Sequence, residues 1–246
     1  AVCEPGIREY TMEAELNYAF MRGGSRAPAY CSIVAAGDNA CILHYDRNDD
    51  EVKDGDLILI DAGCEYQYYA SDITRTFPAS GTFNPQQKAI YEVVLKAQDA
   101  AIAAVQPGAA WDAPHNASVK TITQGLIKLG LIKGTLSQAL KTEAYRDFYM
   151  HRVGHWIGID VHDVGDYKID GEWRLLEPGM VTTIEPGIYI APDNKKVPQK
   201  WRGIGVRIED DVLVTKKGNR VLTTGIPKTV DEIETFMAKA QQARAA

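Results

Sequence analysis

Four carboxylates stand at positions of the sequence where an acidic side chain is unexpected. Asp61 ends the apolar stretch LILID, Asp72 lies in YASDITRT, and Glu185 interrupts the apolar segment MVTTIEPGIYI. A buried carboxylate without a partner is costly or becomes protonated, so each of these groups is expected to have a partner. For Glu185 that partner is either a cationic side chain or a metal ion. Glu209 could pair with Arg207, two residues earlier on the same face of a strand, or bind a metal beside it.

The spacing of Asp61 and Asp72 predicts that their side chains meet. If the chain reverses at Tyr66-Gln67, the two aspartates lie directly opposite each other on paired antiparallel strands. Their Cβ atoms would then be roughly 4.5–5.5 Å apart, where like charges destabilise the pair. A cation between them would turn this repulsion into attraction. For a single Asp at the end of a strand, a turn-forming role is the alternative.

Histidines are concentrated in one segment, MHRVGHWIGIDVHD. Three of the five in the chain fall there: His151, His155 and His162. Gly154 and Gly158 flank them and would let the backbone approach a ligand closely, so a functional role is expected. By contrast, His44 in CILHYD is expected to be structural, and His115, in a polar helical stretch, is expected to lie at the surface.

The charges of these groups suggest how many cations they hold. Four carboxylates and one neutral imidazole carry −4, which two divalent ions would cancel. The proposed set is Asp61, Asp72, His155, Glu185 and Glu209. Oxygen-rich ligation with one histidine favours Mn²⁺, with Co²⁺, Fe²⁺ or Zn²⁺ as alternatives. Two ions about 3.5–4 Å apart could lower the pKa of a shared water from about 15.7 towards ~7 and polarise a carbonyl, so the sequence predicts metal-assisted hydrolysis.

Helices must help to position these residues. Thr11 is predicted to cap a helix over 12–22 that stops at Gly23-Gly24. Asn84, with Pro85 and Gln87 after it, is predicted to begin a helix that ends before Pro107-Gly108. Its apolar residues repeat at helical spacing: Ile90, Val94, Ala97, Ala101 and Val105. Further helices are predicted over about 112–129 and 230–239.

The expected strands contain the four carboxylates. β-Branched and aromatic residues, bounded by Gly or Pro, predict strands over 57–61, 69–77, 180–190 and 204–215. Helices and strands are therefore grouped rather than alternating. This order favours an α+β fold with a curved antiparallel sheet backed by helices. No Pro/Ser-rich linker divides the chain, so residues 1–246 are expected to form a single catalytic domain.

Composition excludes several classes of protein. The chain has 246 residues, of which 45% are hydrophobic and 24% charged, as in an ordinary globular protein. A net charge of −6 argues against a nucleic-acid partner. No run of about 18 apolar residues predicts a membrane span, and no signal peptide is evident. The four scattered cysteines are typical of reduced thiols in a cytoplasmic protein.

Several stretches together resemble the pita-bread metallopeptidases, and within them the branch directed at proline. The resemblance covers essentially the whole chain and rests on LILIDAG, SDITRTF, GHWIGIDVHDVG, LEPGMVTTIEPGIYI and RGIGVRIEDD. It implies a dinuclear aminopeptidase that removes the first residue from peptides with proline in second position. A metal-bridging hydroxide would attack the peptide bond, and a homo-oligomer is a further expectation. The alternatives are prolidase, methionine aminopeptidase and a non-enzymatic binding module of the same fold.

The resemblance also implies a role for each site residue. Asp61 would chelate one ion, Asp72 and Glu209 would bridge both, and His155 and Glu185 would complete the other shell. Glu185 would also accept a proton. Four further positions would surround the substrate: His44, His151, His162 and Arg207. His162 and His151 would shuttle protons or stabilise the tetrahedral intermediate, His44 would contact the scissile bond, and Arg207 would orient site groups.

Two features depart from the family pattern. Relatives generally carry a smaller α/β domain ahead of the catalytic one, and the sequence, which opens at Ala1, is expected to lack it. The position after His151 is usually small in relatives, whereas Arg152 stands there in this chain. An added positive charge beside the site is expected to alter substrate preference.

Overall fold

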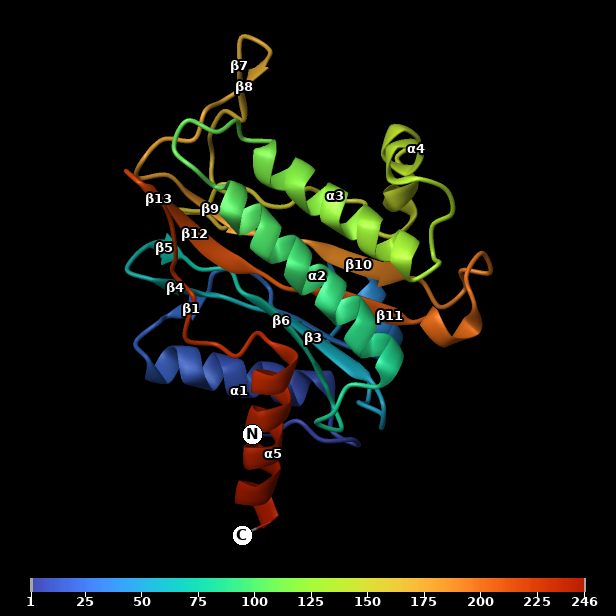
Figure 1. The fold of residues 1–246 in the computed structure, drawn as a ribbon. Coiled ribbons are helices and arrows are strands. Elements are labelled where there is room, and N and C mark those ends of the chain that lie inside the picture. Colours follow the sequence, from blue (N-terminus) through green and yellow to red (C-terminus); the bar gives the residue numbers. More distant parts are fainter. Residues whose placement is uncertain (1, 246) are drawn as a thin grey trace.

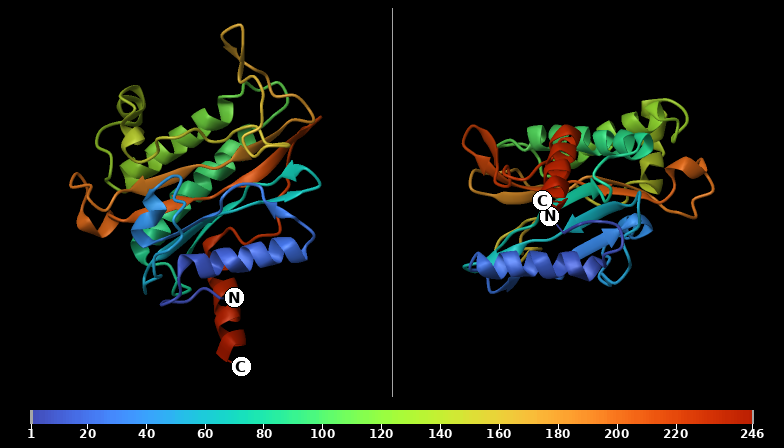
Figure 2. Two further views of the ribbon diagram at one scale, coloured as in Figure 1. Left: turned by 180° about the vertical axis from the view of Figure 1, so that it is seen from behind. Right: turned by 90° about the horizontal axis from the view of Figure 1, so that it is seen from below.

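The strands lie in layers between helices on two sides. The computed structural model describes residues 2–245. Figure 1 shows α1 (Glu9–Arg22) on one side of the strands and α2 (Pro85–Ala104) with α3 (Ala113–Lys128) on the other. The view from below in Figure 2 shows the same order of layers. Every strand pair is antiparallel, so the predicted α+β class is confirmed.

The first half of the chain builds the layers nearest α1. Strands β2, β3 and β6 form one three-stranded sheet in the order β2-β3-β6, and β1, β4 and β5 form another in the order β1-β4-β5. The elements are β1 (Ala27–Pro28), β2 (Ile33–Ala36), the short 3-10 helix η1 (Gly37–Cys41), β3 (Leu57–Asp61), β4 (Cys64–Tyr66), β5 (Tyr69–Ala70) and β6 (Thr74–Pro78).

The second half supplies the remaining helices and sheets. Strands β9, β12 and β13 form a sheet in the order β13-β12-β9, while β10 pairs with β11 and β7 with β8. The helices after α3 are α4 (Leu136–Lys141), η2 (Ala144–Asp147), η3 (Gln199–Trp201) and α5 (Val230–Ala245). The strands are β7 (Lys168–Ile169), β8 (Glu172–Trp173), β9 (Val181–Ile184), β10 (Gly187–Ile190), β11 (Ile204–Arg207), β12 (Asp210–Thr215) and β13 (Gly218–Val221).

Helix α2 forms as its local sequence predicts. Asn84 accepts hydrogen bonds from the backbone N–H groups of Gln86 and Gln87, and the Gln87 side chain returns one to the Asn84 backbone. The predicted apolar stripe from Ile90 to Val105 is fully buried. The predicted helices over 112–129 and 230–239 are also confirmed, although α5 extends to Ala245. None of the helices described within residues 2–245 is long and apolar enough to cross a membrane.

Helix α1 begins earlier than predicted. It starts at Glu9, so Thr11 lies inside the helix and the predicted N-cap is wrong. The reason is tertiary, because the Glu9 carboxylate is completely buried and accepts hydrogen bonds from Ala36 N, Asp50 N and the Tyr45 hydroxyl. These bonds to distant residues fix the first turn in place of a local cap.

Candidate metal centre and active site

The five predicted ligands lie where strands end or are interrupted. Asp61 is the last residue of β3, and Asp72 lies between β5 and β6. Glu185 separates β9 from β10, and Glu209 separates β11 from β12. Each long strand predicted around the last three carboxylates is therefore broken at the carboxylate. Such interruptions re-aim a side chain out of the regular alternation of a strand, which lets groups from different sheets converge.

His155 reaches the carboxylates from an irregular segment that lies against β9. Its carbonyl accepts from Thr183 N at 3.0 Å, and its own N–H donates to Thr183 Oγ1 at 3.1 Å. A Cβ atom on Gly154 would stand 1.9 Å from the Thr183 carbonyl oxygen, so only glycine permits this contact. The sequence suggested that Gly154 lets the backbone approach a ligand closely. The structure shows instead that Gly154 lets the backbone approach β9. This approach serves to position the next residue, His155.

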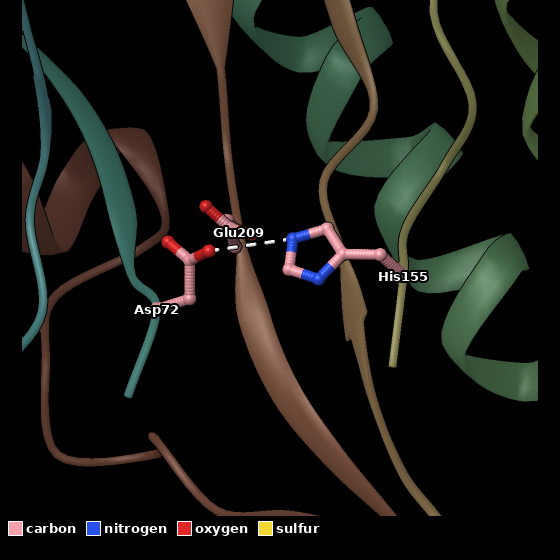
Figure 3. Close-up of side chains that lie close together, drawn as sticks. All are labelled: Asp72, His155 and Glu209. Atoms are coloured by element: carbon pink, nitrogen blue, oxygen red, sulfur yellow. Dashed lines mark ion pairs between the residues drawn. The ribbon is translucent and has the colours of Figure 1, made fainter. Parts of the chain in front are cut away.

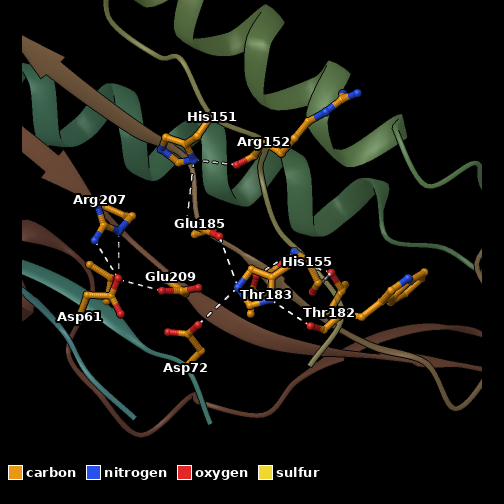
Figure 4. A network of polar contacts seen from close by, with 12 residues as sticks. Asp61, Asp72, His151, Arg152, His155, Thr182, Thr183, Glu185, Arg207 and Glu209 are labelled. Carbon is orange, nitrogen blue, oxygen red and sulfur yellow. Dashed lines mark hydrogen bonds and ion pairs between the residues drawn. The ribbon is translucent and has the colours of Figure 1, made fainter. Parts of the chain in front are cut away.

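Asp72, His155 and Glu209 converge closely enough to share one metal ion. One ligand atom of each lies within 4.8 Å of the others, and Figure 3 shows the three side chains pointing towards a common point. His155 Nε2 is 3.4 Å from Asp72 Oδ2 and 3.6 Å from Glu185 Oε1. Figure 4 shows Glu185 next to Glu209 and His155, and Asp61 on the other side of Glu209 from His155. The structure thus brings all five predicted ligands together.

Asp61 and Asp72 meet through a register different from the predicted one. The hairpin turns at Gln67-Tyr68, and Asp61 pairs with Thr74, so the predicted position of Asp72 opposite Asp61 is wrong. Because the turn lies one residue later than predicted, the partner of Asp61 lies two residues later, at Thr74 instead of Asp72. Residues two apart in a strand point to the same face, so Asp61 and Asp72 still lie on one face. The Tyr30 hydroxyl contacts Oδ1 of each at 2.5 Å.

Arg207 pairs with a different carboxylate from the one the sequence suggested. Its Nη2 donates to Asp61 Oδ2 at 2.7 Å, and its side chain is 3% exposed. Glu209 Oε2 instead accepts from the Thr74 hydroxyl at 2.7 Å. The pairing of Glu209 with Arg207, one of the two alternatives left open by the sequence, is therefore not the arrangement found.

The electrostatics of the site show a deficit of positive charge. Burial, together with the neighbouring carboxylates, raises the pKa of Glu209 well above its usual range and the pKa of Glu185 to about 8. Burial also raises the pKa of Asp72. Burial alone would lower the pKa of His155, but Asp72 and Glu185 raise it to about 9. The crowded carboxylates therefore favour added positive charge, either as protons or as a metal ion.

Two atoms fit a metal ligand better than any protein partner. Glu209 Oε1 is buried and has no hydrogen-bond partner among the described residues. His155 Nδ1 lies 2.9 Å from the Trp156 carbonyl, which can only accept, so Nδ1 carries an N–H and Nε2 is the atom that would take a proton or a metal ion on the side of the carboxylates. A carbonyl that fixes the tautomer in this way is typical of metal-binding histidines. The residues present thus fit a divalent cation.

The other predicted site residues share one cleft with the five ligands. Its volume is about 950 Å³. The nine predicted residues all line it: His44, Asp61, Asp72, His151, His155, His162, Glu185, Arg207 and Glu209. His162 is exposed at the cleft, with its ring 4.3 Å from that of His155, and partial desolvation beside its neighbours, together with His155, lowers its pKa. His44 is exposed at the cleft, which fits a substrate contact better than the structural role first expected.

His115 is not the surface residue that the sequence predicted. It is half-buried, and its Nδ1 is buried without a hydrogen-bond partner in the described part of the chain. Burial, with Arg152 and Arg146 nearby, lowers its pKa to about 4. Its ring lies 5.9 Å from that of Tyr149, so its helix faces inwards at this position.

Two tyrosines at the site were not predicted. Tyr30 joins Asp61 to Asp72, as described above, and burial raises its pKa well above the usual range. The Tyr189 hydroxyl accepts from Arg207 Nη1 at 3.0 Å and lies 2.9 Å from His151 Nε2. Tyr189 sits in an apolar strand and Tyr30 in a loop, so only their contacts with distant residues distinguish them from ordinary packing residues.

Comparison with known proteins identifies the family. Residues 1–216 match metallopeptidase family M24. The chain belongs to metallopeptidase family M24. This M24 chain is 52% identical over 233 residues to a Xaa-Pro aminopeptidase of Haemophilus influenzae, a match that covers 95% of the chain and 54% of that relative. It is 40% identical over 271 residues to a Xaa-Pro dipeptidase of Mus musculus, with 97% of the chain and 55% of the relative covered.

Solved structures confirm the pita-bread fold of this M24 chain. The aminopeptidase PepP of Pseudomonas aeruginosa superimposes with a TM-score of 0.97 and is 64% identical. That match covers 98% of this chain and 55% of the other. The chain therefore spans about half the length of the relatives that it matches.

Proposed function

We propose that residues 1–246 form a single catalytic domain that removes the first residue from peptides with proline in second position. The observation that carries this proposal is the convergence of five metal-ligand side chains in one cleft of an M24 chain. The names of the relatives, Xaa-Pro aminopeptidase among them, support the preference for proline.

The proposed metal site holds two divalent ions, with Mn²⁺ preferred. By the family resemblance Asp72 and Glu209 would contact both ions, and both belong to the three ligands whose atoms lie within 4.8 Å of one another. Asp61 would complete one shell, and His155 with Glu185 the other. When bound, the ions would make a water more acidic and polarise the carbonyl of the scissile peptide bond. Glu185 is the proposed proton acceptor.

His151 fits a fixed neutral ring better than a proton shuttle. Its Nδ1 lies 2.7 Å from the Arg152 carbonyl, which can only accept, so Nδ1 donates and Nε2 accepts from the Tyr189 hydroxyl. Burial, with Arg207 nearby, lowers its pKa to about 3. With both nitrogens occupied, His151 would contact the substrate, and proton transfer falls to the exposed His162.

Proline sets particular demands on such a site. A peptide bond to proline is a tertiary amide without an N–H group, and the ring of proline fixes its shape. The site cannot use a hydrogen bond from the scissile nitrogen and should instead hold the ring against flat surfaces. His44 and His151, both lining the cleft, would supply these surfaces. His162 would deliver the proton that the departing proline nitrogen needs.

A dipeptidase is the second candidate. The 40% identity to a Xaa-Pro dipeptidase over 97% of the chain favours it specifically. The two candidates differ in whether the substrate continues beyond proline. An aminopeptidase uses contacts with the residues that follow, so it should prefer the longer peptide.

The test is a comparison of hydrolysis rates for Ala-Pro-Ala, Ala-Pro and Met-Ala-Ser with saturating Mn²⁺, repeated with Co²⁺ and Zn²⁺. We expect Ala-Pro-Ala to be cut fastest. A preference for Ala-Pro would identify a dipeptidase, and a preference for Met-Ala-Ser would identify a methionine aminopeptidase. No hydrolysis of any peptide by metal-loaded protein would contradict the proposal that this domain is active by itself.

A further inference from the structure

Two cations are stacked on one tryptophan at the wall of the cleft. The Arg152 guanidinium carbon lies 4.9 Å from the centre of the Trp173 ring, and Lys168 Nζ lies 4.3 Å from it. Lys168 and Trp173 pair across the short hairpin of β7 and β8. All three residues line the same cleft as the proposed metal ligands. The ring therefore holds two positive charges close together where a substrate would enter.

These two cations have no carboxylate partner, as is true of most lysines and arginines in the described residues. Arg8, Arg47, Arg146, Arg174 and Lys196 each form an ion pair with an acidic side chain. Within residues 2–245, neither Arg152 nor Lys168 has an ion pair, although both are exposed. Two like charges on one ring without a counter-ion repel each other, so an anion near them would be favoured.

The position of Arg152 relates this pair of charges to the substrate. Arg152 directly follows His151, whose ring is 3.9 Å from Glu185 through Nδ1 and Oε2. In Figure 4 the Arg152 side chain points away from the carboxylates of the metal site. Since His151 is a proposed contact of the proline ring, the neighbouring cations lie where the chain beyond proline would pass.

We propose that Arg152 and Lys168, held against Trp173, form a subsite for a carboxylate of the substrate beyond its proline. This inference rests on the proposed function. A carboxylate can come from the C-terminus of a short peptide or from an Asp or Glu side chain, and both sources present the same chemistry to the two cations. Stacking on Trp173 restricts the two long side chains, so less conformational entropy is lost on binding.

Two matched pairs of peptides test the subsite and separate the two sources. Ala-Pro-Ala and Ala-Pro-Ala amide differ in the terminal carboxylate, and the amides of Ala-Pro-Glu and Ala-Pro-Gln differ in the side chain. For each pair, kcat/KM is measured on the Mn²⁺-loaded protein and on R152Q, K168Q and K200Q. The ratio within a pair is independent of the amount of active protein, so a partly unfolded variant cannot mimic the effect. Lys200 is a matched control, because it is stacked on Trp201 at 5.4 Å but does not line the cleft.

We expect the protein to favour the carboxylate member of at least one pair by about three- to tenfold, since an exposed ion pair contributes modestly. R152Q and K168Q should each reduce that ratio several-fold through KM, and K200Q should leave it unchanged. Which pair responds identifies the source of the carboxylate. Equal rates within both pairs would overturn the subsite while leaving the proposed function intact. Release of alanine from none of the four peptides would overturn both.

Discussion

Replacing Arg207 by methionine tests how much the ion pair between Arg207 and Asp61 stabilises the protein, and how much of that stabilisation bound metal can replace. Arg207 is almost completely buried, and its guanidinium lies 2.7 Å from Asp61. Two unit charges about 4 Å apart interact by about 4 kcal/mol at an effective dielectric constant of 20. Removing one partner of a buried pair costs about 3–5 kcal/mol, because the remaining charge is left uncompensated. The metal-free R207M protein should therefore lose about this much free energy of unfolding.

With metal bound, the same substitution should cost less. The ions would compensate Asp61, so we expect the loss to shrink by about 2 kcal/mol. Thermodynamic linkage then requires the R207M variant to bind metal about 30-fold more tightly than the unmodified protein. Denaturant unfolding with EDTA and with excess Mn²⁺ measures the loss of stability without and with metal. Calorimetric titration of metal measures the change in metal affinity.

A second buried arginine provides the control for this experiment. Arg75 contacts Asp210 at 2.8 Å and is also buried, but Asp210 is not a proposed ligand and has Lys228 as a second partner. R75M should destabilise the protein equally with and without metal. If R207M behaved as R75M does, or bound metal more weakly, Asp61 would not be a ligand and the reasoning would be refuted.

Three further predictions concern single groups and pH. His162→Ala should retain its metal but lose ~10²–10⁴ in kcat, the usual effect of a positioned proton donor, and metal loss on elemental analysis would instead make His162 a ligand. Tyr30→Phe should destabilise the metal-free protein by about 1–3 kcal/mol, because two carboxylates lose a shared donor; an unchanged melting temperature would contradict this role. Burial raises the pKa of Glu185 to about 8 and of Asp211 to about 7, so the folded metal-free protein holds protons that the unfolded chain has released. Its melting temperature should therefore fall between about pH 7 and 8, where unfolded histidines, with a pKa of about 6.5, are mostly neutral, and excess Mn²⁺ should reduce the fall. A melting temperature that rises over this range would show that the carboxylates are already compensated.

Local chemistry made some of the fold predictable. The start of α2 could be predicted because Asn84, Pro85 and Gln87 act on one another within a single turn. The strand ending at Asp61 was predictable for a similar reason, since the four residues before Asp61, LILI, are continuously apolar. The candidate site followed from carboxylates that interrupt such segments, because an acid in an apolar strand needs a partner from elsewhere.

The remaining features depend on contacts between distant parts of the chain. The hairpin after β4 turns at Gln67-Tyr68 with positive φ angles of 51° and 65°, although neither residue favours that conformation. Tertiary contacts must stabilise this turn, so the register could not be obtained from turn residues alone. In the same way, the pairing of Arg207 with Asp61 joins strands 146 positions apart. Sequence spacing pointed to the nearer Glu209.

The most direct test of the central claim is the number of metal ions that one chain binds. After reconstitution with Mn²⁺ and dialysis, elemental analysis should find close to two ions per chain. Asp72→Ala should lose most of both, because Asp72 is a proposed bridge, whereas Asp46→Ala, an exposed acid that lines the same cleft, should retain both. A chain that binds no divalent metal, or an Asp72→Ala variant that still binds two, would contradict the account.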